Sequence, residues 1–316
     1  MYKIVILDAD TLGDDINLTE IEQFGEITKY GTTSNENTAN RIKDADIVIS
    51  NKVFIGNNEV ENAKNLKLVC VAATGYNNID IKALNSKNIA VTNVKGYSTQ
   101  SVAQLVFASI LNIYGSVSDY NTIIRKGEWQ KSPTFNMLNF PINDLEGKVI
   151  GIIGHGSIGK KVEQIAKAFD MKVILLGFNN RKYPESEHRY NKEEFFKKSD
   201  FVTIHCPLTT ETKNLISANE LNMMKSSAIL INTARGPVVN TDDLYNALKN
   251  KTIRAAVFDV FEQEPPKNHP IFSLNNAYIT PHIAWASFES RQRLIAGIAY
   301  NIRCFIDGNI DEIRIR

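Results

Sequence analysis

A set of glycines directly after an apolar segment restricts the folds open to this chain more than any other feature. The apolar segment is Val149–Ile153, and Gly154-His155-Gly156-Ser157-Ile158-Gly159 follows it without a break. The apolar segment predicts a buried strand, and Gly159–Phe169 has the spacing of a helix. Glycines in the order G-x-G-x-x-G between a strand and a helix predict a βαβ unit that binds a dinucleotide. The alternative is a glycine-rich turn that binds nothing.

Each position of this loop has a physical task in such a unit. Gly154 allows the tight turn, Gly156 lets the backbone approach a pyrophosphate, and Gly159 lets the helix pack close to the strand. The amides of Ser157 and Ile158 lie in the first helical turn, where N–H groups lack helical partners and the dipole favours an anion. We therefore expect these five residues to hold the pyrophosphate of the cofactor.

Short runs rich in Val and Ile alternate with helix-compatible segments along most of the chain. In the first hundred residues the runs are Lys3–Leu7, Glu26–Tyr30, Asp46–Ser50, Leu66–Ala72 and Ile89–Asn93, with helical segments such as Glu36–Lys43 and Asn58–Lys64 between them. After the glycine loop the expected strands are Lys172–Leu176, Phe201–His205, Ala228–Thr233, Ala255–Val260 and Ala277–Pro281. This alternation predicts α/β architecture with doubly wound parallel sheets.

Two long helices are expected outside this pattern. Thr99 to Lys126 is interpreted as one helix that Gly127 ends, and its beginning, Val102–Ala108, is apolar nearly all round. A helix without a polar face is buried in a core or a subunit interface. The residues from Glu128 to Glu146 resemble a loop that reaches towards another subunit. The last helix is expected from Ser287 to about Asp307.

Composition excludes several classes of function. With 316 residues the chain is long enough for two domains, and its net charge of +1 offers no basic excess for nucleic acid. It contains no apolar stretch that could span a membrane, and its first residues form a strand instead of a secretion signal. The three cysteines are too widely spaced for a zinc site or a disulfide framework. We expect a cytoplasmic protein that binds neither nucleic acid nor membrane.

Three residues with complementary chemistry follow apolar strands. Arg235, Glu264 and His282 each come after an expected strand end, where a doubly wound sheet binds its ligand. Arginine can hold a carboxylate and polarise a ketone, and histidine can exchange a proton near neutral pH. A neighbouring carboxylate favours the imidazolium and orients its ring. Each residue alone is more often structural, but together they fit the reduction of a 2-oxo acid by hydride transfer.

The end of the second strand bears on cofactor choice. An NAD site usually carries an acidic residue there for the ribose hydroxyls, whereas this strand ends at Gly177. The basic and amide residues that follow, including Asn179 and Arg181, could accommodate a 2′-phosphate. The cofactor is therefore expected to be NAD or NADP, with Gly177 favouring NADP.

These motifs resemble those of the D-isomer-specific 2-hydroxyacid dehydrogenase family, and most of all its glycerate dehydrogenases (hydroxypyruvate reductases). The resemblance covers essentially the whole chain. The motifs are Ala73–Asp80, Tyr97–Gln104, the glycine loop, His205–Leu208, Asn232–Gly236, Asp259 with Glu264 and Pro265, and Pro281–Ser287. The glycine at 177 is the departure, because many relatives have aspartate there.

The resemblance implies a role for each of these residues. It makes His282 the general acid/base, Glu264 its partner and Arg235 the arginine that binds substrate. The other substrate contacts it implies are Lys52, Thr74, Gly75 and Tyr76. The further cofactor contacts it implies are His205, Pro207, Thr212, Thr233, Ala234, Asp259, His282 and Trp285.

The resemblance also implies a domain layout and an assembly. Residues 1–98 and 288–316 would form a flavodoxin-like substrate domain, with a dinucleotide-binding domain at 99–287 inserted between them. The protein would be a homodimer through the cofactor domain, and its substrate a small acid such as hydroxypyruvate or glyoxylate. The alternatives are a dehydrogenase for pyruvate or phenylpyruvate, or a non-catalytic NAD(H)-sensing protein like related corepressors. Formate dehydrogenases of this fold pair their histidine with glutamine, which Glu264 argues against.

Overall fold

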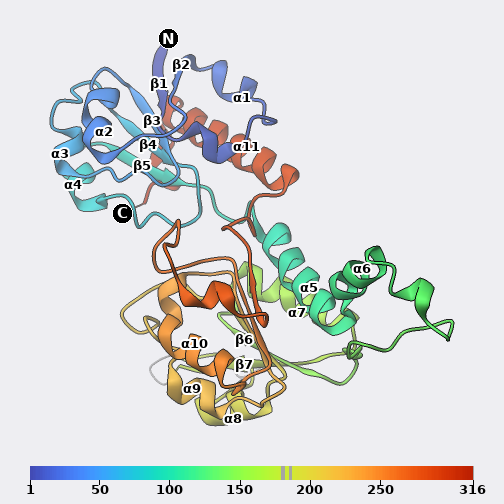
Figure 1. Ribbon diagram of the computed structural model, residues 1–316. Helices are drawn as coiled ribbons and strands as arrows, with labels where there is room; N and C mark the ends of the chain where they lie inside the picture. Colours follow the sequence, from blue (N-terminus) through green and yellow to red (C-terminus); the bar gives the residue numbers. More distant parts are fainter. Residues whose placement is uncertain (179–181, 185–186, 316) are drawn as a thin grey trace. The chain divides into compact units, whose positions relative to one another are not determined.

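Two compact units make up the chain in the computed structural model, which describes residues 1–178, 182–184 and 187–315. One unit combines Met1–Ser98 with the C-terminal segment from Ala286, and the other is Thr99–Trp285 (Figure 1). The second unit is therefore inserted in sequence into the first. The prediction of two doubly wound parallel-sheet domains, one inserted into the other, is confirmed.

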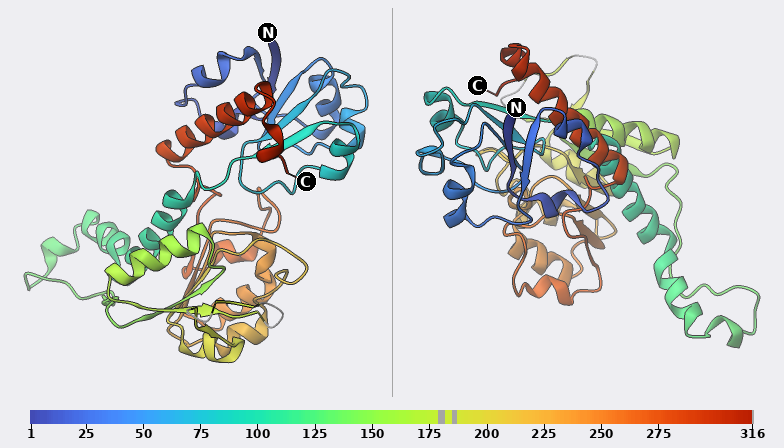
Figure 2. Two further views of the ribbon diagram at one scale, coloured as in Figure 1. Left: turned by 180° about the vertical axis from the view of Figure 1, so that it is seen from behind. Right: turned by 90° about the horizontal axis from the view of Figure 1, so that it is seen from above.

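The first unit is built on a parallel sheet in the order β2-β1-β3-β4-β5. Its strands are β1 (Tyr2–Ile6), β2 (Gly25–Lys29), β3 (Ile47–Ser50), β4 (Leu68–Val71) and β5 (Ala90–Asn93). Its α-helices are α1 (Thr19–Glu22), α2 (Asn35–Ile42), α3 (Asn57–Val60), α4 (Ile81–Ser86) and α11 (Phe288–Ile306). Helix α11 packs against α1 and β4, while α2, α3 and α4 pack on one another (Figure 2). This strand order is the flavodoxin-like one.

The second unit is built on a parallel sheet in the order β12-β11-β10-β9-β6-β7-β8. Its strands are β6 (Val149–Ile153), β7 (Lys172–Leu176), β8 (Arg189–Tyr190), β9 (Phe201–Ile204), β10 (Ile229–Asn232), β11 (Ala255–Phe258) and β12 (Ala277–Ile279). Its α-helices are α5 (Thr99–Gly115), α6 (Val117–Arg125), α7 (Ser157–Ala168), α8 (Lys192–Lys198), α9 (Ala218–Met223) and α10 (Thr241–Lys249). The strand order reverses between β6 and β9, and ligands of doubly wound sheets bind at such a reversal.

The two faces of this sheet carry separate cores. Alternate residues of β6 point to opposite faces, so Ile150 and Ile152 pack with α5 and α7, while Ile153 packs with α8, α9 and α10. Gly151 lies on the second face, where an added Cβ would come within 2.6 Å of the ring of Phe195. The apolar beginning of α5 lies in the first of these cores, where Val102 to Phe107 are mostly buried.

The prediction of one helix from Thr99 to Lys126 is wrong. The helix breaks at Ser116, whose backbone is left-handed with φ of 49°, and α5 and α6 meet at an angle of 57°. The Ser116 hydroxyl donates to the carbonyl oxygen of Pro141 at 2.9 Å, which holds the break against the following loop. Gly115 comes directly before the break, and a glycine–serine pair is a local signal for a kink that the prediction of a single helix overlooked.

Most other boundaries differ by one or two residues, but the helical segment predicted at Asn58–Lys64 is the shorter helix α3, Asn57–Val60. Helix α7 begins at Ser157 instead of Gly159, with Gly156 as its N-cap, and most strands are slightly shorter than expected. The two-residue strand β8, Arg189–Tyr190, was not predicted, because two residues carry no alternation that a sequence pattern could reveal. No single helix in the described part of the chain is long and apolar enough to cross a membrane, although α5 and α6 meet the length and composition criteria as a bent pair.

Candidate active site

The glycine loop has the close backbone packing that its sequence predicted. Gly154 has φ of 92°, and a Cβ there would lie 2.6 Å from the backbone nitrogen of Cys206. A Cβ on Gly159 would lie 2.2 Å from the carbonyl oxygen of Gly154. A Cβ on Gly156 would meet nothing within 4 Å, so the backbone borders open space there. With the first-turn amides of α7 beside it, this arrangement fits a pyrophosphate.

Several buried side-chain atoms lack a hydrogen-bond partner among the described residues, and two of them lie just after β9 and β10. These two are Oγ1 of Thr233, just after β10, and Nδ1 of His205, just after β9. The other imidazole nitrogen of His205, Nε2, lies 2.9 Å from the hydroxyl of Thr203 on β9. Buried polar groups are normally hydrogen-bonded, so an unpartnered pair at the carboxyl edge of a sheet fits a polar ligand. Both residues were predicted cofactor contacts.

Other predicted cofactor residues shape the loops at this edge. The buried hydroxyl of Thr212 donates to the carbonyl oxygen of Pro207 at 2.7 Å, so Thr212 orders the loop that carries Pro207. The amide of Ala234 donates to the side chain of Asn232. Trp285 is half-buried at the end of the unit. Asn179 and Arg181, also predicted cofactor contacts, lie outside the described residues.

The carboxylate of Asp259 organises the turn after β12. It is only 1% exposed and accepts hydrogen bonds from the hydroxyl of Thr280 at 2.6 Å and from the amides of Ile283 and Ala284 at 2.8 and 2.9 Å. Burial raises the pKa of Asp259, and these three donors oppose that effect. Sequence reasoning predicted a cofactor contact here and missed this positioning role. An aspartate one residue beyond a strand is found both in residues that contact a cofactor and in residues that hold a turn, so this pattern does not tell the two roles apart.

His282 is the residue that this turn presents. Its backbone has φ of 55°, a conformation that costs free energy in a non-glycine residue and persists only where neighbours enforce it. Its Nδ1 lies 2.6 Å from Oε2 of Glu264, and the two side chains are 25% and 33% exposed. Oε1 of Glu264 accepts from the amide of Phe261 at 2.9 Å. The histidine and glutamate predicted as partners are therefore in contact, and the contact occupies Nδ1, not Nε2.

Arg235 reaches the same edge from β10. Its guanidinium donates to the carbonyl oxygen of Ala234 at 2.7 Å, and its own carbonyl accepts from Asn232. The next residue, Gly236, packs so closely on the loop after β11 that a Cβ there would lie 2.0 Å from the carbonyl carbon of Phe261. Arg235 and the loop that carries Glu264 are thus joined through backbone packing.

The predicted substrate residues outside this unit lie at strand ends of the five-stranded sheet. The amide of Lys52, after β3, donates to the buried carboxylate of Asp8 at 2.6 Å. Thr74, after β4, donates its hydroxyl to the carbonyl oxygen of Val94 at 2.9 Å. Gly75 is half-buried and Tyr76 is 41% exposed. These residues therefore occupy an ordered edge with accessible side chains.

The comparisons with known proteins agree with this geometry. Residues 107–284 match the model of the D-isomer specific 2-hydroxyacid dehydrogenase, NAD binding domain. The chain belongs to this family. It is accordingly an NAD(P)-dependent oxidoreductase that acts on a CH–OH group, and it reduces 2-oxo acids to 2-hydroxy acids.

The family's named members include close relatives over nearly the full length. The chain is 37% identical to the hydroxypyruvate reductase of Blautia hydrogenotrophica, over 97% of this chain and 98% of that protein. It is also 37% identical to the glycerate dehydrogenase of Methylorubrum extorquens, over 98% of both. Among solved structures, an acyclic imino acid reductase in complex with NADPH and D-Arg is 30% identical with a TM-score of 0.87, over 99% of this chain and all of that one.

The lowered pKa of His205 makes stability depend on pH. Burial lowers its pKa from 6.5 to about 3, so between these values the folded chain binds fewer protons than the unfolded chain. The free energy of unfolding should then be undiminished above about pH 6.5 and fall as the pH falls, by at most about 1.4 kcal/mol per pH unit. We expect His205→Gln to reduce the dependence of the unfolding free energy on pH, measured by urea unfolding at about pH 5 to 6. The reduction should correspond to the uptake of up to one proton on unfolding. Identical slopes for both proteins would contradict the assignment.

Proposed function

We propose that the protein reduces hydroxypyruvate to D-glycerate or glyoxylate to glycolate, with His282 as the general acid. The observation that carries the proposal is the 2.6 Å contact between His282 and Glu264 at the edge of a dinucleotide-binding sheet. The names of the full-length relatives, hydroxypyruvate reductase and glycerate dehydrogenase, support the substrate class. A nicotinamide dinucleotide bound at the glycine loop would supply the hydride.

The chain's own residues account for the remaining steps. Arg235 binds the substrate carboxylate and polarises the ketone through its planar guanidinium. His282 gives a proton to the carbonyl oxygen from Nε2 as the hydride reaches C2, so that the carbonyl group becomes an alcohol. Glu264 holds Nδ1, which leaves Nε2 as the ring nitrogen that exchanges the proton. Residues Thr74 to Tyr76 and Lys52 are proposed to contact the substrate as well.

The cofactor residues are proposed on the same grounds. Gly154, Gly156 and Gly159 shape the loop, and the amides of Ser157 and Ile158 bind the pyrophosphate. The two unpartnered atoms, Oγ1 of Thr233 and Nδ1 of His205, face the cofactor, as do Pro207, Ala234 and Trp285. Asp259 acts on the cofactor side mainly by holding the turn of His282.

We also propose a homodimer through the segment from α6 to the loop before β6. Helix α6 buries none of its residues within this chain. Large apolar side chains are exposed along the segment, among them Val117, Trp129 and Ile142, with Phe135 at 87% and Leu138 at 77%. A row of exposed apolar residues on one segment is typical of a protein interface. A second copy of the chain is the proposed partner.

The substrate class is tested by measuring kcat/KM for hydroxypyruvate, glyoxylate, pyruvate and phenylpyruvate with NADH and with NADPH. We expect hydroxypyruvate and glyoxylate to exceed the other two acids by at least about tenfold, equivalent to about 1.4 kcal/mol of transition-state binding. A preference for phenylpyruvate would contradict the substrate class. An absence of turnover with every acid, despite dinucleotide binding, would favour the sensor alternative.

The role of His282 is tested by His282→Gln, with Glu264→Gln as the matched variant. His282→Gln should lower kcat by about 10²- to 10⁴-fold while dinucleotide affinity, measured by fluorescence, stays within about twofold. Glu264→Gln keeps the acid but replaces the carboxylate that orients its ring through Nδ1, so kcat should fall by a smaller factor than with His282→Gln. Unchanged turnover of His282→Gln would show that another group is the acid.

The dimer is tested by the double substitution Phe135→Asp and Leu138→Asp. Placing two charges in an apolar interface should shift sedimentation from dimer to monomer without changing the circular dichroism spectrum. Ile306→Asp, an equally simple change of an exposed apolar residue on α11, should leave the dimer intact. A parent protein that sediments as a monomer would refute the interface.

A further inference from the structure

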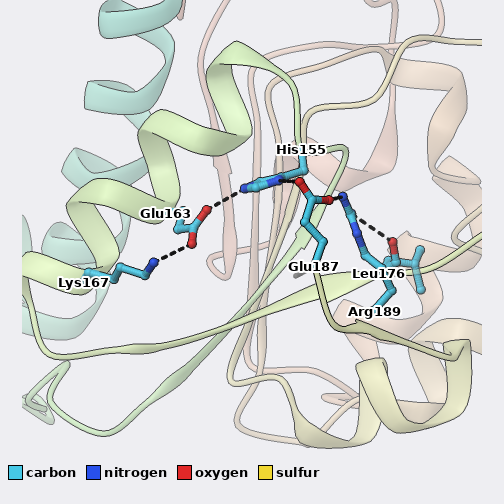
Figure 3. A network of polar contacts seen from close by, with 6 residues as sticks. All are labelled: His155, Glu163, Lys167, Leu176, Glu187 and Arg189. Carbon is cyan, nitrogen blue, oxygen red and sulfur yellow. Dashed lines mark hydrogen bonds and ion pairs between the residues drawn. The ribbon is translucent and has the colours of Figure 1, made fainter. Parts of the chain in front are cut away.

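A carboxylate lies beside the glycine loop that the sequence pattern does not place there. Glu187 precedes β8, and its Oε1 lies 3.5 Å from Nδ1 of His155, the second residue of the loop (Figure 3). Its Oε2 accepts a hydrogen bond from Nη2 of Arg189. Nη1 of Arg189 donates in turn to the carbonyl oxygen of Leu176, the last residue of β7, at 3.4 Å. Glu187 thus stands between the glycine loop and the carboxyl end of β7.

An NAD site has an acidic residue close to the glycine loop and the end of the second strand. There the carboxylate accepts hydrogen bonds from the ribose hydroxyls, and it normally comes from the end of the second strand. Here that strand end is Gly177, and the space beside it is already taken. A Cβ on Gly177 would lie 3.1 Å from Cβ of Arg189 and 3.3 Å from the carbonyl oxygen of Tyr190. Strand β8 therefore fills the space beside Gly177 with Arg189 and Tyr190, and Glu187, just before β8, supplies a carboxylate nearby.

The carboxylate is held by a built set of contacts. The guanidinium of Arg189 lies 4.3 Å from the centre of the Tyr183 ring, and the Tyr183 hydroxyl accepts from the amide of Phe178 at 3.1 Å. The side chain of Arg189 is only 12% exposed. Its guanidinium lowers the pKa of Glu187, which keeps the carboxylate ionised.

The opposite side of the cluster is anchored on α7. Nε2 of His155 lies 2.5 Å from Oε2 of Glu163, and Glu163 is paired with Lys167 at 2.6 Å. Both ring nitrogens of His155 thus face carboxylates, one from α7 and one from the segment before β8. His155 joins the two parts of the cluster. The side chain of Glu187 is 27% exposed, so the carboxylate is partly accessible to a ligand.

We propose that Glu187 binds the adenosine ribose hydroxyls of the cofactor and makes this chain prefer NADH to NADPH. The inference rests on the proposed dinucleotide-dependent reaction. A 2′-phosphate in this place would meet a carboxylate of the same sign, which opposes its binding. Arg189 acts as a positioning residue, since its charge is already committed to Glu187. The preference is opposite to the one that Gly177 alone suggested.

The test is a fluorescence titration of the full chain with NADH and NADPH, for the parent and for Glu187→Gln. The parent should bind NADH at least about tenfold more tightly than NADPH. Loss of a charged acceptor should weaken NADH binding by about tenfold and leave NADPH binding equal or stronger. Glu163→Gln is the matched control: it also removes a carboxylate next to His155, but one on α7, and the NADH to NADPH ratio should stay within about twofold of the parent.

Two results would overturn the assignment: a parent that prefers NADPH, or a ratio that Glu187→Gln leaves unchanged. The first would mean that Arg189 exchanges its partner for the phosphate. A thermal unfolding midpoint equal to that of the parent shows that Glu187→Gln is folded. The titration contains no 2-oxo acid, so a failure of the proposed reaction would appear as absent turnover with the binding preference intact.

Discussion

The candidate site depends on the carboxylate of Asp259. Burying a charge is costly unless donors surround it, and this one receives three hydrogen bonds within the turn after β12. Those bonds hold the backbone on both sides of His282, which has a left-handed conformation that the chain would not adopt unaided. The direction of the imidazole, and with it the contact to Glu264, follows from this buried ion.

The rest of the site is set by where backbones approach one another. Gly154 and Gly159 bring β6 and α7 together, and Gly236 brings the end of β10 against the loop after β11. A Cβ at any of these positions would lie 2.0 to 2.6 Å from a backbone atom of the facing segment, so the two backbones could not stay this close. Because all strands in this sheet are parallel, their carboxyl ends lie at one edge, and residues far apart in sequence become neighbours there.

The adenosine end of the site shows why a strand end should not be interpreted from its own residues alone. Gly177 lacks a carboxylate, and from the sequence this favoured a phosphate-binding pocket. In the fold, β8 pairs with β7 through Leu175 and Arg189, which returns Glu187 to the glycine loop ten residues further along the chain. The pairing of two strands, one of them only two residues long, places a charge that no local pattern indicates.

The sequence by itself was sufficient for the class of fold, most strands, the glycine loop and the residues that form the His282–Glu264 pair. Apolar runs predict the strands, and the spacing of the glycines, which reflects packing against a strand, predicts the loop. Both signals are therefore local in the sequence. The tertiary structure alone decided the turn-holding role of Asp259 and the position of Glu187. Each of these depends on a hydrogen bond or ion pair whose partner lies elsewhere in the chain or in a strand too short to recognise, and such contacts exist only once the sheet has brought the partners together.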